Sequence, residues 1–357
     1  MRVCCVTGGT GGHIYPALAL VKKWEQLDPS LDILFIGNDD RMEADLIPAQ
    51  GYRFKALHTS GLVGGVIGKA KAVMQLGLAY GKAKAYLKEY KPDIVIGFGG
   101  YVSAPVILAA HALKIATVIH EQNSIVGKAN QHVMKKVDAI ITCYDKCKEV
   151  FPKDKIHLLG NPRATIAKEA SFDEDYFKSL GLDLNKKTIL IVMGSLGSKS
   201  VNALMKEALK DVGDELQFLY VCGKDNSNDL NLFNGKENIH VVSYVDTLRI
   251  YAHIEGMICR AGATTLAEVT ALGIPAIIIP SPYVANNHQF YNASVLVNEG
   301  AAYMIEEKNL NAETLEKNIR TLFGNPEEME KVSKQARKLG NPEAAYDIIE
   351  LCKKLVK

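Results

Sequence analysis

The first candidate for chemistry is a glycine-rich turn that ends in a titratable ring. The segment TGGTGGH (7–13) places Gly8, Gly9, Gly11 and Gly12 directly before His13. Glycine tolerates positive φ angles and close approach of a ligand to the backbone, and free N–H groups at the start of a following helix favour an anion. Histidine is a suitable general base because its unperturbed pKa is about 6.5. The turn therefore predicts a phosphate-bearing ligand with a proton acceptor beside it.

Two later segments repeat this pattern of strand, glycine turn and helix. GFGGYVSAP (97–105) follows the apolar run DIVI, and MGSLGSKSVN (193–202) follows TILIV. The turn TGGTGGH (7–13) has neither the GxGxxG spacing of a dinucleotide fold nor the Lys-Ser/Thr ending of a P-loop. A nicotinamide dinucleotide or ATP is therefore not the expected ligand.

The densest set of polar residues lies in CRAGATTLAEVTALGIP (259–275). We expect a strand to end at Arg260, and a helix to begin after Gly262 with Thr264. Glu268 lies four residues after Thr264, so both share one helix face. Amides and hydroxyls can hold a diphosphate, whereas a carboxylate suits paired ribose hydroxyls, which predicts a nucleotide site. The stretch ANNHQFYNA (285–293) adds side chains that could bind sugar hydroxyls: Asn287, His288, Gln289 and Asn292.

For these turns to lie close together, the strands before them must end at the same edge of a sheet. Apolar runs in the sequence predict such strands. Such runs alternate with helical patterns at 2–8, 32–37, 93–98, 116–121 and 139–143, and again at 188–194, 217–223, 239–245, 256–260 and 276–280. Continuous apolar strands separated by helices indicate parallel sheets covered on both faces. Two such sets predict an α/β protein with two Rossmann-like, doubly wound domains facing a cleft.

We place the domain boundary within LLGNPRATIA (158–167), where Gly160, Asn161 and Pro162 break regular structure. This gives a first domain over 1–162 and a second over 163–342. A helical pattern follows over 343–357, and we expect it to pack back on the first domain.

Composition narrows the class of protein. The chain has 357 residues, which suits two domains or one large α/β unit, and 48% of them are hydrophobic and 23% charged, as in a folded soluble protein. A net charge of +2 gives no reason to expect nucleic acid as a partner. The seven cysteines form no CxxC pair or Cys/His cluster, which predicts reduced core thiols in a cytosolic protein. We find no signal peptide and no apolar run of membrane-spanning length, so we expect any membrane contact to be peripheral.

One stretch is both basic and apolar. No acidic residue occurs between Asp45 and Glu89, an interval that holds Arg53, Lys55 and further lysines. Its second part, GLVGGVIGKAKAVMQLGLAYGKAKAYLK (61–88), interleaves lysines with large apolar residues. This pattern suits an anionic membrane surface, and it also suits an amphipathic helix that packs on a sheet with solvated lysines. We expect both, with one part of the helix packed and the other touching lipid.

The ordered set of motifs resembles the MurG family of UDP-N-acetylglucosamine transferases. The matching segments are GGTGGHIYPALA, DRMEADLIP, GFGGYVSAP, HEQNSIVGKAN, GNPRA, GSLGSKSVN and RAGATTLAEVTALGIPAIIIPSPYVANNHQFYNA, and they cover nearly the whole chain. The resemblance implies a GT-B fold, with the acceptor mostly in the first domain and the donor mostly in the second. It implies inverting transfer of GlcNAc from UDP-GlcNAc to the C4 hydroxyl of MurNAc in lipid I. The product is lipid II, so the implied process is peptidoglycan and cell-wall synthesis at the cytoplasmic face of the bacterial cell membrane.

The resemblance also assigns residues to ligands. Those implied for the donor are Thr10, Gly11, Gly12, Asn123, Arg163, Ser195, Val245 (through its backbone), Ala263, Thr264, Thr265, Glu268 and Gln289. His288 stands where another amide can occur in the family, so its share in sugar binding stays open. For the diphosphate of the acceptor, we expect the two glycine turns of the first domain: Gly8, Gly9, Gly99, Gly100 and the adjacent Tyr101.

The transfer requires a base and a means of stabilising the leaving UDP. His13 is the first choice of base, with a helix-capping or phosphate-contacting role as its alternative, and Glu121 in HEQN is the second choice. No Asp-x-Asp metal signature lies at a strand end, and Asp39 and Asp40 fall in a surface-loop segment of the resembling proteins. Helix-start amides together with Ser195, Thr264 and Arg163 could hold the diphosphate instead. We therefore predict neither a metal nor a cofactor, and UDP-GlcNAc, lipid I and an anionic membrane surface as partners.

Three other functions remain open at the level of sequence. Another GT-B lipid glycosyltransferase would keep the donor site and change the acceptor. A UDP-GlcNAc 2-epimerase would need further carboxylates and no lipid acceptor, and the basic apolar stretch argues against it. A non-catalytic sugar-nucleotide sensor would bind UDP-GlcNAc without transferring the sugar.

Overall fold

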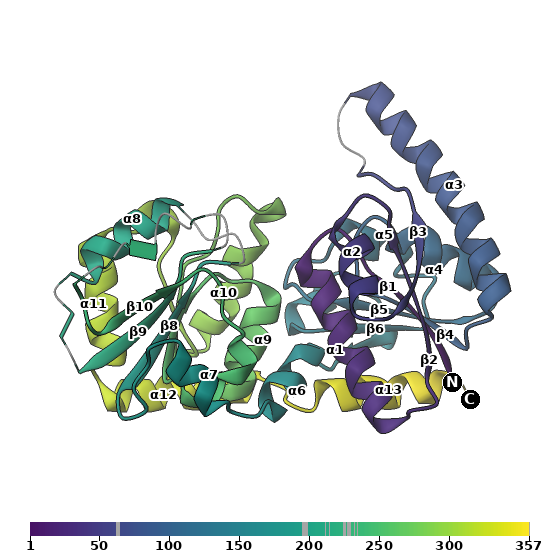
Figure 1. Ribbon diagram of the computed structural model, residues 1–357. Coiled ribbons are helices and arrows are strands. Elements are labelled where there is room, and N and C mark those ends of the chain that lie inside the picture. Colours follow the sequence, from purple (N-terminus) through teal and green to yellow (C-terminus); the bar gives the residue numbers. More distant parts are fainter. Residues whose placement is uncertain are drawn as a thin grey trace. The chain divides into compact units, whose positions relative to one another are not determined.

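The chain folds into two compact units. The structure, a computed structural model, describes residues 1–61, 65–194, 199–210, 212–213, 215–223, 226, 230–231, 233 and 235–356. Unit 1 comprises Met1–Arg163 and Glu343–Lys357, and unit 2 comprises Ala164–Pro342 (Figure 1). This division falls one residue after the boundary that the sequence suggested.

Unit 1 is built on a parallel sheet with helices on both faces. Its described strands run in the order β3-β2-β1-β4-β5-β6-β7. They are β1 (Arg2–Val6), β2 (Asp32–Asn38), β3 (Arg53–Leu57), β4 (Ile94–Gly97), β5 (Ala116–Glu121), β6 (Ala139–Thr142) and β7 (Ile156–Leu158). The helices are α1 (Gly11–Leu27), α2 (Met42–Ala49), α3 (Val66–Tyr90), α4 (Ser103–Ala112), α5 (Lys128–Val133) and α13 (Ala344–Leu355), with short 3-10 turns at η1 (Asp145–Glu149) and η2 (Lys153–Lys155). Helix α6 (Pro162–Glu169) contains the boundary between the units, and its residues from Ala164 on belong to unit 2.

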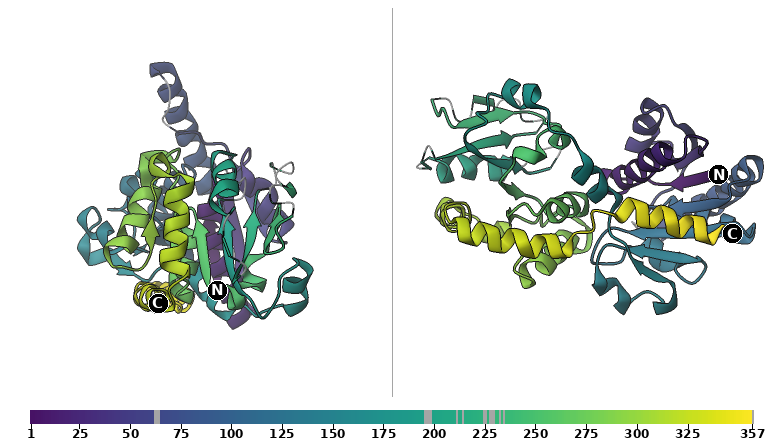
Figure 2. Two further views of the ribbon diagram at one scale, coloured as in Figure 1. Left: turned by 90° about the vertical axis from the view of Figure 1, so that its left-hand side faces the viewer. Right: turned by 90° about the horizontal axis from the view of Figure 1, so that it is seen from below.

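One face of this sheet is covered by helices from both ends of the chain. Buried side chains of α1, α2 and α13 form one apolar cluster with those of β1, β4 and β5. Figures 1 and 2 show α13 beside α1. The ammonium group of the buried Lys23 lies 5.2 Å from the ring centroid of Tyr346 and adds a cation–π contact between these helices. The expectation that the C-terminal helix packs on the first domain agrees with this arrangement.

The other face carries α3, α4 and α5. Helix α3 packs against α4 over its C-terminal half, and Figure 1 shows its N-terminal half extending past the sheet of unit 1. Val66, Val73, Met74 and Leu78 are exposed there, and Val66 is 86% exposed. Of the helices in the described residues, none combines the length and apolarity needed to cross a membrane.

Unit 2 repeats the parallel design. Its described strands run in the order β10-β9-β8-β11-β12-β13, namely β8 (Lys187–Val192), β9 (Leu216–Val221), β10 (Ile239–Val242), β11 (Gly256–Cys259), β12 (Ala276–Ile278) and β13 (Tyr303–Met304). The helices are α7 (Glu174–Ser179), α8 (Lys199–Ala208), α9 (Ala263–Leu272), α10 (His288–Asn298), α11 (Ala312–Phe323) and α12 (Pro326–Leu339). Short 3-10 turns lie at η4 (Thr247–Arg249), η5 (Tyr251–His253), η6 (Ala285–Asn287) and η7 (Glu307–Asn309). Side chains of α8, α11 and α12 form the main apolar cluster with the strands.

The cysteines belong to the protein interior. All seven are free, and six of them are buried. Burial raises the pKa of Cys352 to about 12, and burial together with the nearby Glu268 charge raises the pKa of Cys259 to about 12. Thiols with such values are poor nucleophiles at neutral pH, in agreement with the expectation of core thiols.

Candidate active site

The glycine turn after β1 leads directly into α1. Thr10 is the N-cap residue in an extended conformation, its side chain makes no capping hydrogen bond, and the first turn of α1 holds no acidic residue. The first N–H groups of a helix have no partner within it, so those of Gly11 and Gly12 can bind an anion. The N–H of Gly9 instead donates to Oε2 of Glu43 over 3.0 Å, so it is engaged within the protein and does not point to a ligand.

The second glycine turn, after β4, packs on the first. Gly99 and Gly100 have φ angles of +111° and +85°, which residues other than glycine rarely adopt. A Cβ atom on Gly100 would lie 2.5 Å from the carbonyl oxygen of Gly8. The hydroxyl of Ser103 accepts from the N–H of Gly99 over 3.2 Å and donates to its carbonyl oxygen over 2.8 Å. The bare backbones of the two turns thus allow direct contact within unit 1.

His13 lies against this second turn. A Cβ atom on Gly99 would lie 2.8 Å from the His13 ring. Nδ1 of His13 is 2.9 Å from the carbonyl oxygen of Gly8. Because a carbonyl oxygen can only accept, Nδ1 carries the proton and Nε2 carries the lone pair in the neutral ring. The geometry gives His13 the tautomer that a general base requires at Nε2.

The predicted acceptor residues meet in unit 1, but not all of their N–H groups are free. Gly8, Gly9, Gly99 and Gly100 lie around the contact of the two turns. The N–H groups of Gly9 and Gly99 are bonded within the chain, so the backbone of these two residues does not supply the expected N–H donors. Tyr101 is half exposed, and its ring packs on Gly61, where a Cβ atom would lie 2.7 Å away.

Glu121, the second choice of base, is buried at the end of β5. Its Oε1 accepts from the N–H of Asn123 over 3.1 Å. Its Oε2 accepts from the N–H of Gly127 over 2.9 Å and from Nδ2 of Asn130 over 2.8 Å. The three hydrogen bonds that this carboxylate accepts hold the 122–128 loop in place.

His120, which sequence reasoning did not single out, lies in the interior beside this site. Its Nε2 donates to the carbonyl oxygen of Gly160 over 3.0 Å, and its ring stacks on Phe98 with centroids 5.4 Å apart. Burial lowers the pKa of His120 to about 4, against a smaller opposing effect of its hydrogen bond to Gly160. The ring is therefore neutral at physiological pH. The HEQN segment contained this histidine, and its place inside an apolar strand was the available signal.

The candidate nucleotide site of unit 2 is a cavity of about 310 Å³ at the ends of β8, β11 and β12. Its lining includes Gly194, Arg260, Gly262, Thr265 and Gln289. Helix α9 begins beside it at Ala263, with Gly262 as an extended N-cap and no side-chain cap. The free N–H groups of this helix start favour a phosphate. Within the described residues, the buried hydroxyl oxygen of Thr264 has no hydrogen-bond partner.

Glu268 lies one turn further along α9 and is buried. Its Oε2 accepts from the hydroxyl of Tyr251 over 2.7 Å. Tyr251 was not predicted from the sequence, because no local pattern between η5 and α9 indicates that Tyr251 contacts Glu268. The carboxylate that was predicted to bind ribose is therefore held in one orientation by a buried phenol.

Gln289 joins two strand ends. The same side-chain atom receives the N–H groups of Ser281 over 2.9 Å and Ala261 over 3.3 Å. Two donors pointing at one atom identify it as the amide oxygen, which turns the NH₂ group the other way. Nδ1 of His288 donates to the carbonyl oxygen of Ala285 over 2.8 Å, and the buried Asn292 donates to that of Ala261. Asn292 thus supports the backbone next to the site.

The remaining predicted donor residues fall in several places. Asn123 and Arg163 are half-buried in unit 1, and the N–H of Arg163 donates to Oδ1 of Asn161 over 3.0 Å. Val245 is buried between β10 and η4 of unit 2. Ser195 lies outside the described residues.

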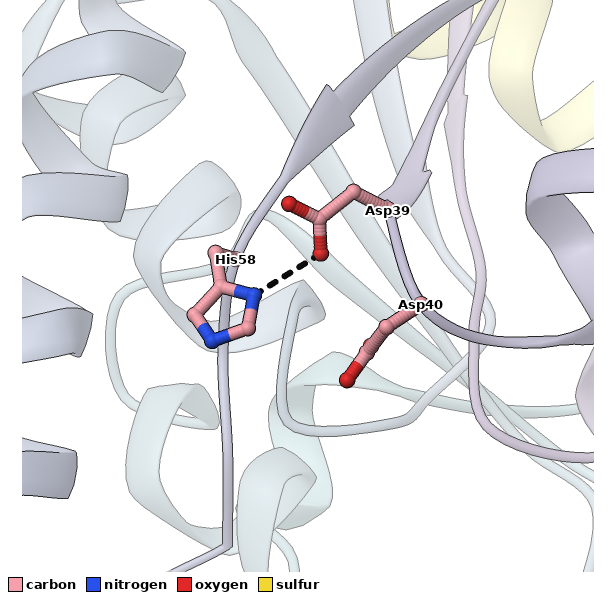
Figure 3. Close-up of side chains that lie close together, drawn as sticks. All are labelled: Asp39, Asp40 and His58. Atoms are coloured by element: carbon pink, nitrogen blue, oxygen red, sulfur yellow. Dashed lines mark hydrogen bonds and ion pairs between the residues drawn. The ribbon is translucent and has the colours of Figure 1, made fainter.

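Asp39, Asp40 and His58 form a cluster at the ends of β2 and β3 in unit 1 (Figure 3). Their potential ligand atoms lie within 4.8 Å of one another, and all three side chains are exposed. Nδ1 of His58 is 2.8 Å from Oδ1 of Asp39. An exposed hydrogen bond between the two side chains accounts for this arrangement.

Comparisons with known proteins now identify the class. Residues 3–142 match the glycosyltransferase family 28 N-terminal domain, and residues 188–351 match the glycosyltransferase family 28 C-terminal domain. The crystal structure of MurG from Acinetobacter baumannii is similar with a TM-score of 0.81 and 28% identity, over 99% of each chain. The chain is therefore a glycosyltransferase of family 28 with a GT-B fold, which confirms the predicted fold class.

The particular family follows from a second comparison. The chain is 39% identical to the UDP-N-acetylglucosamine–N-acetylmuramyl-(pentapeptide) pyrophosphoryl-undecaprenol N-acetylglucosamine transferase of Halalkalibacterium halodurans, with all of both chains covered. It belongs to this family, the MurG transferases, as the sequence motifs predicted. A putative UDP-N-acetylglucosamine 2-epimerase from Listeria monocytogenes is similar at a TM-score of 0.73 with 16% identity, a likeness that concerns the fold alone.

Proposed function

We propose that this protein transfers GlcNAc from UDP-GlcNAc to the C4 hydroxyl of MurNAc in undecaprenyl-diphosphate-MurNAc-peptide, converting lipid I to lipid II. The 39% identity to a MurG transferase over the full length of both chains supports this reaction. The observation that carries the chemistry is the hydrogen bond from His13 Nδ1 to the carbonyl oxygen of Gly8, because it leaves Nε2 able to accept the proton of a hydroxyl.

The reaction is a single displacement at the anomeric carbon of GlcNAc. The C4 hydroxyl loses its proton to Nε2 of His13 while its oxygen attacks that carbon from the face opposite UDP. The bond from the anomeric carbon to the β-phosphate oxygen breaks, and its electron pair leaves with UDP. Inversion follows from this in-line geometry. In this proposal Glu121 holds the adjacent loop and His13 alone serves as base.

Charge on the leaving diphosphate is met by fixed dipoles. The uncapped start of α9 at Ala263, with Thr264 and Thr265, presents N–H and hydroxyl groups beside the unit 2 cavity. Arg163 and Ser195 are further candidates for the same task. With these groups we expect the reaction to need no metal ion and no cofactor.

The other parts of the donor have their own partners in this proposal. Glu268 accepts from the ribose hydroxyls, the NH₂ group of Gln289 donates to the sugar, and the backbone at Val245 meets the uracil. In unit 1 the Thr10-Gly11-Gly12 turn and Asn123 complete the donor contacts.

The acceptor is a membrane lipid, and α3 supplies a surface that suits it. Val73, Met74 and Leu78 are exposed on this helix, with exposed lysines among them at Lys69, Lys71 and Lys82. Apolar side chains interleaved with basic ones favour an anionic bilayer surface. We place the protein peripherally at the cytoplasmic face of the cell membrane, where UDP-GlcNAc and lipid I are both available.

The test is transfer of radiolabel from UDP-GlcNAc to a short-chain lipid I analogue, with chelator present. We expect wild-type transfer to survive chelation and His13→Ala to lower kcat by about a hundredfold or more, as for loss of a general base. The exposed His111 provides a control, since His111→Ala should keep full activity. UDP-GlcNAc binding without transfer by the wild type would contradict the proposed acceptor.

A further inference from the structure

Glu43 is a buried carboxylate on α2 that lies under the glycine turn. It is fully buried. Its Oε2 accepts from the N–H of Gly9 over 3.0 Å. Its Oε1 accepts from the N–H and the Nδ2 of Asn38, over 3.0 and 3.2 Å. Both oxygens thus face donors, so this position requires an acceptor on each side.

One peptide group connects this carboxylate to His13. The N–H of Gly9 and the C=O of Gly8 belong to the same planar unit, and in a trans peptide they point in opposite directions. The N–H reaches Glu43, and the C=O accepts from Nδ1 of His13 over 2.9 Å. The path therefore runs from the Glu43 carboxylate through the Gly8–Gly9 peptide to the His13 ring.

Glu43 and His13 each pack closely against a glycine, where a larger residue would not fit. A Cβ atom on Gly8 would lie 2.4 Å from Oε1 of Glu43, and one on Gly99 would lie 2.8 Å from the His13 ring. Gly9 has a φ angle of +91°, which turns the peptide into this orientation. The bare backbone of the turn is thus explained in part by the protein's own packing, and not by a ligand alone.

We propose that Glu43 is a positioning residue for the transfer, which acts by holding the Gly8–Gly9 peptide so that its C=O faces Nδ1 of His13. This fixes the proton on Nδ1 and the lone pair on Nε2. Hydrogen bonds in such a chain polarise one another, so a charged acceptor at one end strengthens the bond to His13 at the other. The inference rests on the proposed role of His13 as base.

The far side of Glu43 is anchored as well. Oδ1 of Asn38 accepts from the N–H of Thr59 over 3.1 Å and from its hydroxyl, and all of these side chains are buried. Glu43 therefore cannot rotate without breaking bonds to two strand ends. This anchoring makes it a fixed support for the turn.

The deciding variant is Glu43→Gln. An amide has one oxygen and one NH₂ group, so it must set a donor against either Gly9 or Asn38. Asp45→Asn is the matched control, because Asp45 is an exposed acid on the same helix. We expect Glu43→Gln to lower kcat roughly ten- to hundredfold, as for a misplaced catalytic group, with little change in the KM for UDP-GlcNAc, and Asp45→Asn to leave both unchanged.

Two readouts separate positioning from a general loss of structure. ¹⁵N spectra of labelled histidine, with the His13 signals identified by His13→Ala, should show Nδ1-protonated His13 in the wild type and a mixture of tautomers in Glu43→Gln. In a His13→Ala background, Glu43→Gln should have no further effect on kcat. An unchanged tautomer, or an equal loss of kcat in both backgrounds, would overturn the proposal.

The spectrum requires no substrate, so it tests the path even if the acceptor is not lipid I. Wild-type transfer together with an unchanged Glu43→Gln variant would reject the path and leave the proposed function in place. If Glu43→Gln does not fold, Gly8→Ala displaces the carboxylate by its Cβ atom and keeps the charge. Gly8→Ala should change the His13 tautomer in the same direction as Glu43→Gln. If its ¹⁵N spectrum equals that of the wild type, the path is again rejected.

Discussion

The hydroxyl of Tyr251 donates to Oε2 of Glu268 over 2.7 Å, and both side chains are buried. Tyr251 belongs to η5 and Glu268 to the second turn of α9, which starts at the unit 2 cavity. This hydrogen bond restrains the rotation of the carboxylate. In the proposed function, Tyr251 thus sets how Glu268 meets the two ribose hydroxyls.

Removal of the Glu268 carboxylate should weaken the donor and spare the acceptor. A hydrogen bond to a charged group contributes about 1.5–3 kcal/mol, so Glu268→Ala should raise the KM for UDP-GlcNAc roughly tenfold to a hundredfold. The KM for the acceptor should stay nearly constant. Steady-state kinetics with each substrate varied in turn measures both values, and equal increases would reject the assignment of Glu268 to the ribose.

Tyr251→Phe should loosen the same contact without removing it. We expect an increase of roughly fivefold in the KM for UDP-GlcNAc, the size of a single modest hydrogen bond. The sharper measurement uses the 2′-deoxyribose analogue of UDP-GlcNAc, which the wild type should discriminate against more than the variant does. Tyr244→Phe is a control at an exposed tyrosine. The same discrimination in Tyr251→Phe and wild type would contradict the positioning role.

Acid should destabilise unit 1 through His120. Its pKa is about 4 in the folded protein, because burial lowers it from about 6.5. Between these values the unfolded chain binds the extra proton, so stability falls as pH drops from about 6.5 to 4 and levels off below. The shift corresponds to roughly 3 kcal/mol.

Trp24 makes this measurable, since it is the chain's one tryptophan and is buried in unit 1. Its fluorescence during urea unfolding should give midpoints that fall across this pH window. His120→Gln keeps a donor for the carbonyl oxygen of Gly160 and should flatten the dependence, whereas the exposed His111→Gln should keep it. An unchanged slope in His120→Gln would assign the acid sensitivity to other groups.

The central strands were predictable, and of the edge strands in the described residues only β10 was predicted. β1, β4, β5 and β11 read as continuous apolar runs because both of their faces are covered by helices. The three strands that the sequence reading missed, Arg53–Leu57, Ile156–Leu158 and Tyr303–Met304, all lie at sheet edges. An edge strand is only half covered, so it is short or carries polar residues, and its sequence does not stand out.

The site shows the same division. His13 and the glycine turns were predicted because their residue types indicate proton transfer and close approach of a ligand to the backbone. Glu43 and Tyr251 were missed because their roles depend on partners 34 and 17 residues away. Local patterns report helix starts and turns, whereas a pairing across the fold has no local signal.

Membrane binding should depend on the exposed face of α3. Met74 and Leu78 are four residues apart on one helix face, and both are exposed. Glutamate at both positions removes apolar contact and adds repulsion from anionic lipid, so we expect at least about tenfold weaker binding to phosphatidylglycerol vesicles. Transfer to a soluble short-chain acceptor should be unchanged.

Sedimentation with vesicles at two salt concentrations measures this binding, because the contribution of the lysines is screened by salt. Val150→Glu, at an exposed position elsewhere in unit 1, is the control and should bind like the wild type. Full vesicle binding by the doubly substituted α3 would exclude this face as the membrane contact.

Gly99 tests whether the packing of His13 matters for the reaction. Gly99→Ala places a methyl group 2.8 Å from the ring at a φ angle of +111°, which should strain the backbone by about 1–3 kcal/mol and push the ring away from Gly8. We expect a loss of kcat of roughly tenfold or more and a lower melting temperature, with a smaller change in UDP-GlcNAc affinity because most of the proposed donor contacts lie in unit 2. Gly81→Ala, at an uncrowded helical position, should raise helix stability by about 0.5–1 kcal/mol and keep kcat. A destabilised Gly99→Ala with normal kcat would mean that the ring finds its working position without this contact, and the orientation of His13 would then depend on its bond to Gly8 alone.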